Sequence, residues 1–182
     1  MCAGKVIISF YMIELEKTYL LKYFPKGVRN APKKKIADIY FPKNVKHPTL
    51  RLRRAGEKYE MTKKKPVAGR DSSEQIEETI PLTKEEFAAL LKASGKSSEK
   101  MRYYYPYQNR TAEITVFEKK LRGLVLVDVE FGTVEEKNKF EMPEFCLADV
   151  TQEKFAAGGM LAGKSYRDLE KNLSRYGYKK II

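Results

Sequence analysis

The chain is poor in the residues that build disulfide frameworks and zinc sites. Its 182 residues include two cysteines, Cys2 and Cys146, and a single histidine, His47. Two distant cysteines make neither a disulfide framework nor a metal-ligand spacing, which indicates a reducing compartment. One histidine argues against a zinc site.

Long apolar runs are missing as well. The most apolar stretch, "VIISFYMI", lies between Lys5 and Glu14, and it is far shorter than the roughly 20 residues of a membrane-spanning helix. We therefore expect no membrane span, no signal peptide and a soluble, cytoplasmic protein. The length favours one domain over residues 1–182, with a main body over about 5–131 and a helical segment over about 133–182.

Positive charge is abundant but unevenly distributed. Residues 1–70 hold 18 Lys and Arg against 5 Asp and Glu, whereas residues 71–182 hold 18 against 19. A field of this kind attracts polyanions such as nucleic acid, acidic lipid, nucleotides or condensed phosphates. A well-hydrated surface with no ligand explains the charge equally well.

Period-two alternation predicts eight strands separated by turn residues. They are expected near 6–21, 36–41, 49–54, 58–64, 74–80, 100–107, 111–117 and 123–131. Strands that follow one another through short turns favour an antiparallel sheet, and this many twisted strands tend to close. The predicted fold is therefore mainly β, an eight-stranded antiparallel β-barrel with peripheral helices.

Four helices are expected beside the strands. "PLTKEEFAALLKASG" carries a capping box at Thr83 and a stop at Gly95. "TVEEKNKF" predicts a second helix, and residues 151–157 a third. A fourth is expected over 165–176, capped by Ser165 and ended by Gly177. Residues 25–35 and 66–73 are expected to be loops, the second a flexible flap.

Like charges recur in pairs two residues apart within the predicted strands. The pairs are Glu14 with Glu16, Arg51 with Arg53, Lys100 with Arg102, and Asp128 with Glu130. Members of such a pair share one face of a strand, roughly 7 Å apart, and the opposite faces here are apolar. A solvated sheet face gives the same alternation. Segregation of acids and bases onto different strands instead suggests two kinds of ligand. The bases would bind phosphoryl oxygens, and the carboxylates would bind hard divalent cations.

These motifs resemble the CYTH superfamily, the triphosphate tunnel metalloenzymes. "IELEKTYL" is similar to the family's N-terminal E-x-E-x-K signature. The fragments that follow in the family's order are "LRLRRAGEKYEMTKK", "QIEETIPLTKEEF", "KMRYYYPY", "AEITVFEKKLRGLVLVDVEF" and "DVTQEKF". The resemblance implies a barrel whose ionic faces line a tunnel and bind a triphosphate with Mg²⁺ or Mn²⁺. Its members include inorganic, thiamine and RNA triphosphatases and class IV adenylyl cyclases.

Roles for individual residues follow only from this resemblance. The implied phosphate-binding residues are Arg51, Arg53, Lys64, Lys100, Arg102 and Lys154. The implied metal ligands are Glu14, Glu16, Asp128 and Glu130. Glu77 and Glu113 complete the acidic side, as catalytic residues beside a second metal or a nucleophilic water.

The chain departs from the family pattern at several of these positions. Thr18 stands where the signature has lysine, and Thr115 stands where an acid is expected. Gln75 occupies a place often held by glutamate, and 155–157 replace a basic-aromatic run. Each lost group weakens the positioning or electrostatic stabilisation of phosphoryl transfer, so binding should survive better than turnover.

Two other motifs have alternative explanations. "GGMLAGKS" (158–165) satisfies the P-loop expression, but no βαβ pattern surrounds it, so a glycine-rich hinge is the better interpretation. "KMRYYYPYQNR" interleaves bases and aromatics as single-strand nucleic-acid platforms do. We favour a strand with Lys100 and Arg102 facing inward and Tyr103 and Tyr105 packed outward under a helix.

The sequence therefore supports a metal-dependent phosphohydrolase acting on a small-molecule triphosphate: tripolyphosphate, a nucleoside triphosphate or thiamine triphosphate. The alternatives are a catalytically weak nucleotide- or polyphosphate-binding module, a class IV-like adenylyl cyclase, and nucleic-acid binding through the basic half.

Overall fold

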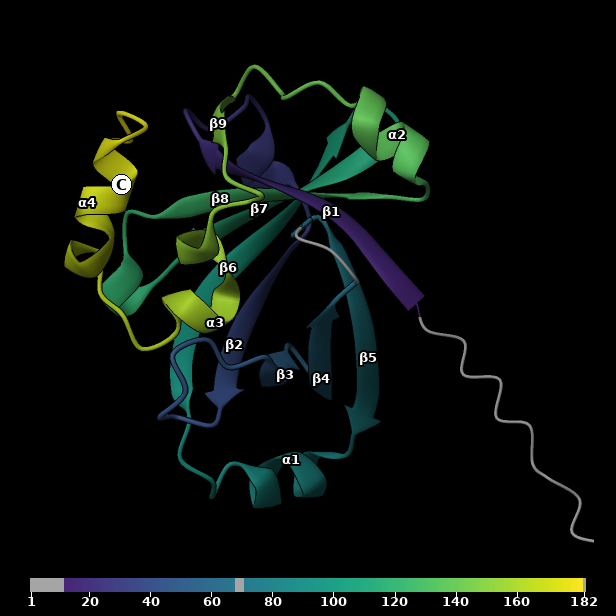
Figure 1. Cartoon of the computed structure of the whole chain (residues 1–182), viewed down its shortest axis with the longest axis vertical. Helices are drawn as coiled ribbons and strands as arrows, with labels where there is room; N and C mark the ends of the chain where they lie inside the picture. The colour runs from purple at the N-terminus through teal and green to yellow at the C-terminus, as the bar shows by residue number, and fades with distance from the viewer. Residues whose placement is uncertain (1–11, 68–70, 182) are drawn as a thin grey trace, which may run out of the picture.

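A closed antiparallel β-barrel forms the body of the computed structural model, which describes residues 12–67 and 71–181 (Figure 1). Within these residues the strands are β1 (Met12–Leu21), β2 (Lys33–Phe41), β3 (Leu50–Ala55), β4 (Lys58–Pro66), β5 (Glu74–Leu82), β6 (Lys96–Tyr107), β7 (Arg110–Phe117), β8 (Val125–Phe131) and β9 (Cys146–Asp149). The first eight close in the order β1-β5-β4-β3-β2-β6-β7-β8 and back to β1. The predicted eight-stranded antiparallel barrel is confirmed; the predicted start of the first strand, 6–11, lies outside the described residues.

The barrel closes through β1, whose one edge serves two partners. Its first half pairs with β5, in the register Met12 to Glu77. Near its end the same edge pairs with β9, in the register Tyr19 to Asp149. A four-residue strand is too short for a period-two pattern to reveal, so β9 was not predicted. The segment expected to be helical therefore contributes a strand to the sheet.

Two strands begin earlier than predicted. β2 begins at Lys33, inside the expected loop, and β6 begins at Lys96. The cause is mutual pairing, since Lys33 lies opposite Tyr103 and Tyr40 opposite Lys96. The lysine side chain at 33 also covers the Tyr103 ring, 5.6 Å from its centroid. The basic run 33–35 is thus part of a strand.

The first two predicted helices are present. Helix α1 (Lys84–Leu90) begins with the predicted capping box, in which Thr83 Oγ1 accepts from the Glu86 amide at 3.2 Å. It ends before the predicted stop at Gly95. Helix α2 (Val134–Lys139) is capped by the Thr133 hydroxyl, which accepts from the Glu136 amide, but the Glu136 carboxylate accepts from the Gly132 amide and no capping box forms. In Figure 1, α1 lies below the barrel and α2 at its upper right.

The C-terminal helices are shorter than predicted. Residues 151–157 form a turn and the 3-10 helix η3 (Lys154–Ala156), because the Thr151 hydroxyl accepts the Thr18 amide of β1 at 3.0 Å instead of entering a helix. Short helices α3 (Gly158–Leu161), η4 (Arg167–Leu169) and α4 (Glu170–Ser174) follow, and η1 (Val28–Asn30) and η2 (Lys119–Leu121) are further 3-10 turns. Ser165 does not cap as predicted, since its hydroxyl donates to the Asp168 carboxylate. None of the described helices has the length and apolarity that crossing a membrane requires.

Two apolar clusters hold the C-terminal segment against the barrel. One covers the outer face of β1, β6, β7 and β8, where the rings of Tyr105 and Phe145 meet edge-on at 5.9 Å. The other joins the inward residues Phe117 and Leu126, near the ends of β7 and β8, to Phe155 and Leu161. One end of the barrel interior is therefore apolar and is filled from the C-terminal segment.

Candidate functional site

A cavity of about 640 Å³ occupies the barrel interior, and charged side chains line its wall. All twelve residues implied by the resemblance line it: Glu14, Glu16, Arg51, Arg53, Lys64, Glu77, Lys100, Arg102, Glu113, Asp128, Glu130 and Lys154. Strand alternation sends residues of one parity to one face, and closure of the barrel turns that face inward. The predicted outward packing of Tyr103 and Tyr105 is confirmed, since both pack against the apolar cluster on the outer face, where Phe145, which lies outside any helix, meets the Tyr105 ring edge-on.

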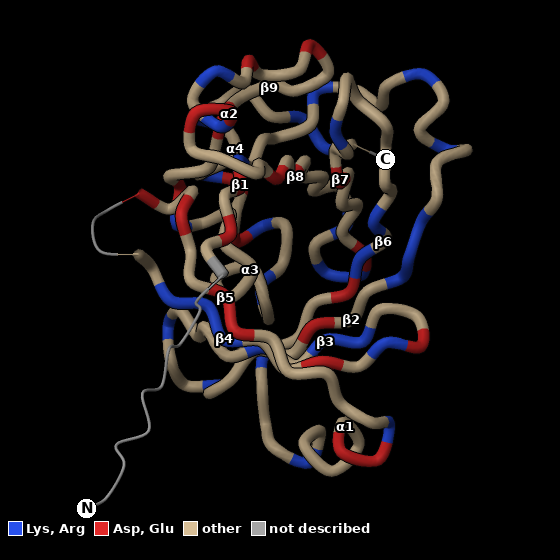
Figure 2. The backbone as a smooth tube through the Cα atoms, turned by 90° about the vertical axis from the view of Figure 1, so that its right-hand side faces the viewer, with Lys and Arg blue, Asp and Glu red and all other residues tan. Residues whose placement is uncertain are grey.

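Acids and bases occupy two contiguous parts of the wall. In the barrel order, β7, β8, β1 and β5 are neighbours and carry the acids from Glu113 to Glu77. Strands β4, β3, β2 and β6 are likewise neighbours and carry the bases, and among the described residues Glu60 of β4 is the one acid of these strands that lines the cavity. Figure 2 marks the basic stretches of β3 and β4 in blue and the acidic stretches of β1 and β5 in red. We call these parts the acidic half and the basic half.

One seam between the halves is closed by Arg102. Its guanidinium pairs with Glu113 and with Asp128, the latter at 3.3 Å, and its Nε donates to Thr115 at 3.1 Å. Thr18 donates to the other Asp128 oxygen at 2.9 Å. The two threonines that replace charged family residues are thus hydrogen-bonded into this seam.

Lys64 closes the opposite seam. Its ammonium pairs with Glu14 and, at 3.1 Å, with Glu77. Burial raises the pKa of Glu77, but the charge and hydrogen bond of Lys64, the hydrogen bond from Thr79 and the charge of Arg51 together outweigh it, and the pKa is lowered. Burial lowers the pKa of Lys64, but the charges of Glu16, Glu14 and Glu77 together raise it more. The pKa of Lys64 is therefore above its ordinary value.

Within the acidic half, Glu14, Glu16 and Glu130 converge. Each offers a carboxylate oxygen, and these oxygens lie within 4.8 Å of one another. Burial, and then the charge of Asp128, holds the pKa of Glu16 well above its ordinary value. Burial and the charges of Glu113 and Glu14 also raise the pKa of Glu130. A bound cation reduces the repulsion among clustered carboxylates. A set of ligands that are all oxygen atoms suits a hard divalent ion.

Residue Asp38 is a site residue that the sequence analysis missed. Its carboxylate is fully buried in the basic half. Arg53 donates to both of its oxygens, at 2.7 and 2.9 Å, and Lys100 Nζ lies 2.8 Å from Oδ2. The signal was present in "IADIY", because Ile36, Asp38 and Tyr40 share one parity.

Arg51 differs from Arg53, Lys64, Lys100 and Arg102 in lacking an acid partner among the described residues. Its side chain is buried, one terminal nitrogen donates to Thr62 at 3.3 Å, and its Nε has no hydrogen-bond partner. A buried guanidinium nitrogen without an acceptor is costly to leave unpaired. This side chain is consequently ready to receive an anionic oxygen.

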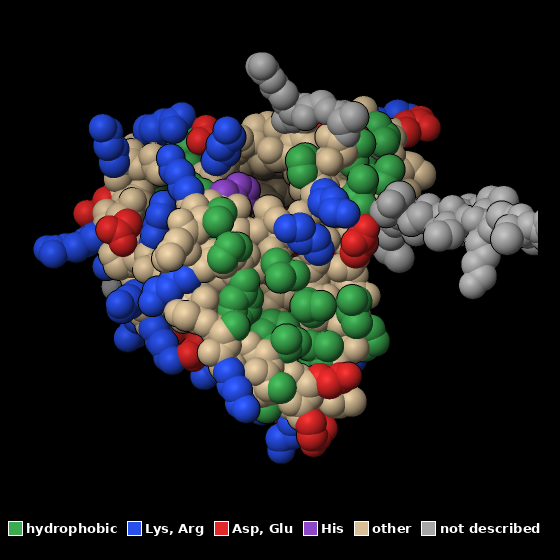
Figure 3. All heavy atoms as spheres, turned by 60° about the horizontal axis from the view of Figure 1, so that its bottom comes forward, with side chains coloured by type: hydrophobic (Ala, Val, Ile, Leu, Met, Phe, Trp, Pro, Cys, Tyr) green, Lys and Arg blue, Asp and Glu red, His purple; other side chains and the backbone are tan. Residues whose placement is uncertain are grey.

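The C-terminal segment borders the cavity through two glycines. A Cβ on Gly158 would lie 2.1 Å from Tyr40 Oη, and one on Gly159 would lie 2.1 Å from the Pro48 carbonyl oxygen. The P-loop interpretation is excluded for the described residues, since every strand pairing is antiparallel. The glycines instead let α3 sit directly against the β2–β3 loop. Figure 3 shows a hollow beside His47, which belongs to that loop.

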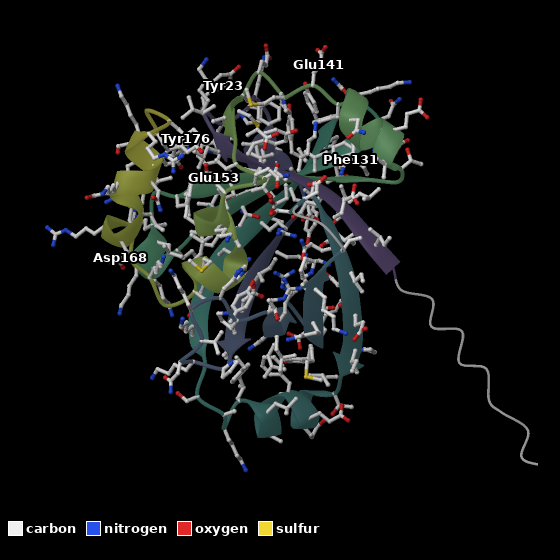
Figure 4. The ribbon with its side chains drawn as sticks, in the orientation of Figure 1. Tyr23, Phe131, Glu141, Glu153, Asp168 and Tyr176 are labelled. Atoms are coloured by element: carbon white, nitrogen blue, oxygen red, sulfur yellow. The ribbon has the colours of Figure 1, made fainter. Side chains whose placement is uncertain are left out.

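Lys154 lies apart from the other bases. Its side chain is exposed at the border of the cavity, on η3. The turn is held from outside by Tyr176, whose hydroxyl donates to Glu153 at 2.6 Å (Figure 4). Phe155 and Ala156, which replace the basic-aromatic run, are buried in the apolar cluster at this end of the barrel.

The model of the CYTH domain matches residues 12–154. The chain belongs to the CYTH family. This CYTH protein is 32% identical to an inorganic triphosphatase of Nitrosomonas europaea over 145 residues, 79% of this chain and 92% of that protein.

Solved structures agree with this assignment. The crystal structure of an inorganic triphosphatase is 27% identical, with a TM-score of 0.59 over 83% of the CYTH protein and 95% of its own chain. A structure from Pyrococcus horikoshii, 18% identical with a TM-score of 0.50 over 92% of both chains, shares the fold.

Proposed function

We propose that this CYTH protein is a metal-dependent triphosphatase that binds a linear triphosphate inside the barrel. The observation that carries the proposal is the division of one cavity wall into a basic half and an acidic half. A triphosphate with divalent cations has the complementary distribution of charge. The similarity to an inorganic triphosphatase supports the same chemistry.

The basic half would hold the phosphoryl oxygens. Arg51 brings a buried guanidinium with an unpaired Nε, Arg53 follows two residues later on the same strand, and Lys100 comes from β6, on the far side of β2. Arg102 and Lys64, at the two seams, would contact the chain where it meets the acidic half, and Lys154 would contact it from the border. Arginine forks suit phosphate oxygens because they donate in pairs.

The acidic half would hold Mg²⁺ or Mn²⁺ through Glu14, Glu16 and Glu130, with Asp128 adjoining them. When bound, the ion supplies charge neutralisation of the phosphoryl oxygens. Of the two carboxylates proposed to orient water, Glu113 is the better base. Burial raises the pKa of Glu113, whereas Lys64 lowers that of Glu77. A higher pKa brings a general base closer to neutral pH.

Phosphate release from tripolyphosphate, ATP and thiamine triphosphate tests the proposal, with Mg²⁺, Mn²⁺ or EDTA present. We expect release with a metal and none with EDTA, and we expect Glu14→Ala to abolish it. Glu78→Gln is the matched control, because Glu78 is exposed and pairs with exposed Lys65 at 3.3 Å on the outer face of β5. Release that is insensitive to both EDTA and Glu14→Ala would contradict the proposal. Cyclic nucleotide is measured in the same ATP reactions.

A triphosphate-binding module with little turnover is the second candidate. It is favoured by the ion pairs of Glu77 with Lys64 and of Glu113 with Arg102, which occupy both proposed water-orienting carboxylates. Calorimetric binding of tripolyphosphate without phosphate release would support it. A gain of activity in Thr18→Lys would then assign the loss of turnover to the missing signature lysine.

A further inference from the structure

Asp38 is a buried acid in the basic half of the cavity wall. Its negative charge repels a triphosphate, so its place among the bases needs a physical reason. Its exposed fraction is zero, and it is absent from the residues that line the cavity. It therefore does not reach a ligand. Its partners Arg53 and Lys100 do line the cavity, from the strands on either side of β2.

The contacts with Asp38 fix the orientation of the Arg53 guanidinium and hold the Lys100 ammonium beside it. Arg53 uses Nε and one terminal nitrogen on Asp38, at 2.7 and 2.9 Å, and these two parallel bonds fix the plane of the guanidinium. Lys100 lies 2.8 Å from the same carboxylate. An arginine has five N–H donors and a lysine three, so donors remain on both side chains after Asp38 is satisfied.

The surroundings of Lys100 show why it needs this acid. Its ammonium is buried and lies 5.5 Å from the centroid of the Phe117 ring on β7. The charged groups that act on it are Asp38 from β2, Arg53 from β3 and Arg102 from its own strand. Two of these three are cations, so Asp38 supplies the compensating charge.

We propose that Asp38 is a positioning residue that locks Arg53 and Lys100 into one rigid, charged pair whose remaining N–H donors face a bound triphosphate. This inference rests on the proposed function, because it assigns these donors to that ligand. Preorganised donors bind an anion without first losing conformational freedom, which favours affinity and turnover together.

The pH profile separates this role from a merely structural one. Burial lowers the pKa of Lys100 to about 8, although Asp38 opposes the shift. Without the Asp38 charge the pKa falls further, so Asp38→Asn should move the alkaline limb of kcat/KM to lower pH. A move of about one pH unit cuts the protonated fraction of Lys100 at pH 8 from about a half to about a tenth, a roughly fivefold loss. The triphosphate titrates in the same way with the wild type and with Asp38→Asn, so its own pKa does not contribute to the difference between the two pH profiles.

A double variant provides the matched control. Arginine stays protonated at all working pH values. The displacement of the alkaline limb caused by Asp38→Asn should therefore disappear when it is introduced into Lys100→Arg, whatever activity that single variant retains. Calorimetry with tripolyphosphate should show weaker binding by Asp38→Asn at pH 7.

The outcomes distinguish this inference from the proposed function. An inactive wild type that also fails to bind tripolyphosphate refutes the proposed function. An active wild type whose pH profile and affinity are unchanged by Asp38→Asn refutes the role of Asp38. If Asp38→Asn does not fold, the ammonium of wild-type Lys100 is followed by ¹⁵N NMR. A freely exchanging ammonium that titrates like a surface lysine overturns the proposal, and a protected one hydrogen-bonded to a carboxylate supports it.

Discussion

Neutralising Glu16 should raise the stability of the metal-free protein and remove its response to Mg²⁺ or Mn²⁺. The substitution Glu16→Gln keeps the shape of the side chain and deletes one charge from the cluster with Glu14 and Glu130. Oxygens at most 4.8 Å apart repel by roughly 3 kcal/mol per pair at an effective dielectric constant of 20. Lys64 offsets part of this repulsion, since it attracts Glu16. We therefore expect a net gain of about 1–2 kcal/mol.

Thermal unfolding measures the effect directly. In EDTA at pH 7, Glu16→Gln should melt about 4 °C above the wild type, because 1 kcal/mol corresponds to about 2–4 °C in a chain of this size. Adding Mg²⁺ or Mn²⁺ should raise the melting temperature of the wild type, since an ion at 100 times its dissociation constant contributes about 2.7 kcal/mol. The variant should respond little to either metal.

The pH dependence has a definite sign. The pKa of Glu16 is raised in the folded state, so the native protein binds more protons than the unfolded chain above the ordinary carboxyl pKa. Stability contributed by this group is then lost as pH rises from about 4.5. Glu16→Gln should flatten that fall in metal-free protein, and Glu78→Gln should not. A variant that melts lower than the wild type in EDTA, or that keeps the full metal response, would refute the repulsive cluster.

Further predictions concern the seam and the C-terminal closure. Lys64→Met should lower the free energy of unfolding by about 1–3 kcal/mol at pH 7, since Glu14 and Glu77 lose their shared cation. Urea unfolding should show this loss shrinking only as the pH falls through the lowered pKa of Glu77, and a loss that stays equal in neutral and in strongly acid solution would contradict the ion pairs. Gly159→Val should destabilise by about 1–3 kcal/mol, because its Cβ would meet the Pro48 backbone. The control Gly132→Ala, whose Cβ meets only a Glu136 side-chain oxygen at 3.3 Å, should unfold near the wild-type temperature.

Local pattern was sufficient for the elements whose signals lie within a few residues. The Thr83 capping box and the inward parity of Lys100 and Arg102 are properties of one helix turn and one strand, and both are as predicted. The prediction that Ser165 caps a helix was wrong, because the direction of a hydrogen bond is not contained in the local pattern. The Asp168 carboxylate, three residues on, accepts a hydrogen bond from the Ser165 hydroxyl, and a residue pattern does not say which group donates.

The sequence by itself determined which side chains share a face of each strand, because alternation along a strand depends only on the chain's own geometry. Closure of the barrel then turned the charged faces inward. Only the tertiary structure decided which strands became neighbours. Barrel closure between β5 and β1 gathered the acids into one half of the wall, and the register of β2 against β3 and β6 placed Asp38 between Arg53 and Lys100. The pairing of distant strands depends on long-range contacts, and no local window of sequence contains both partners.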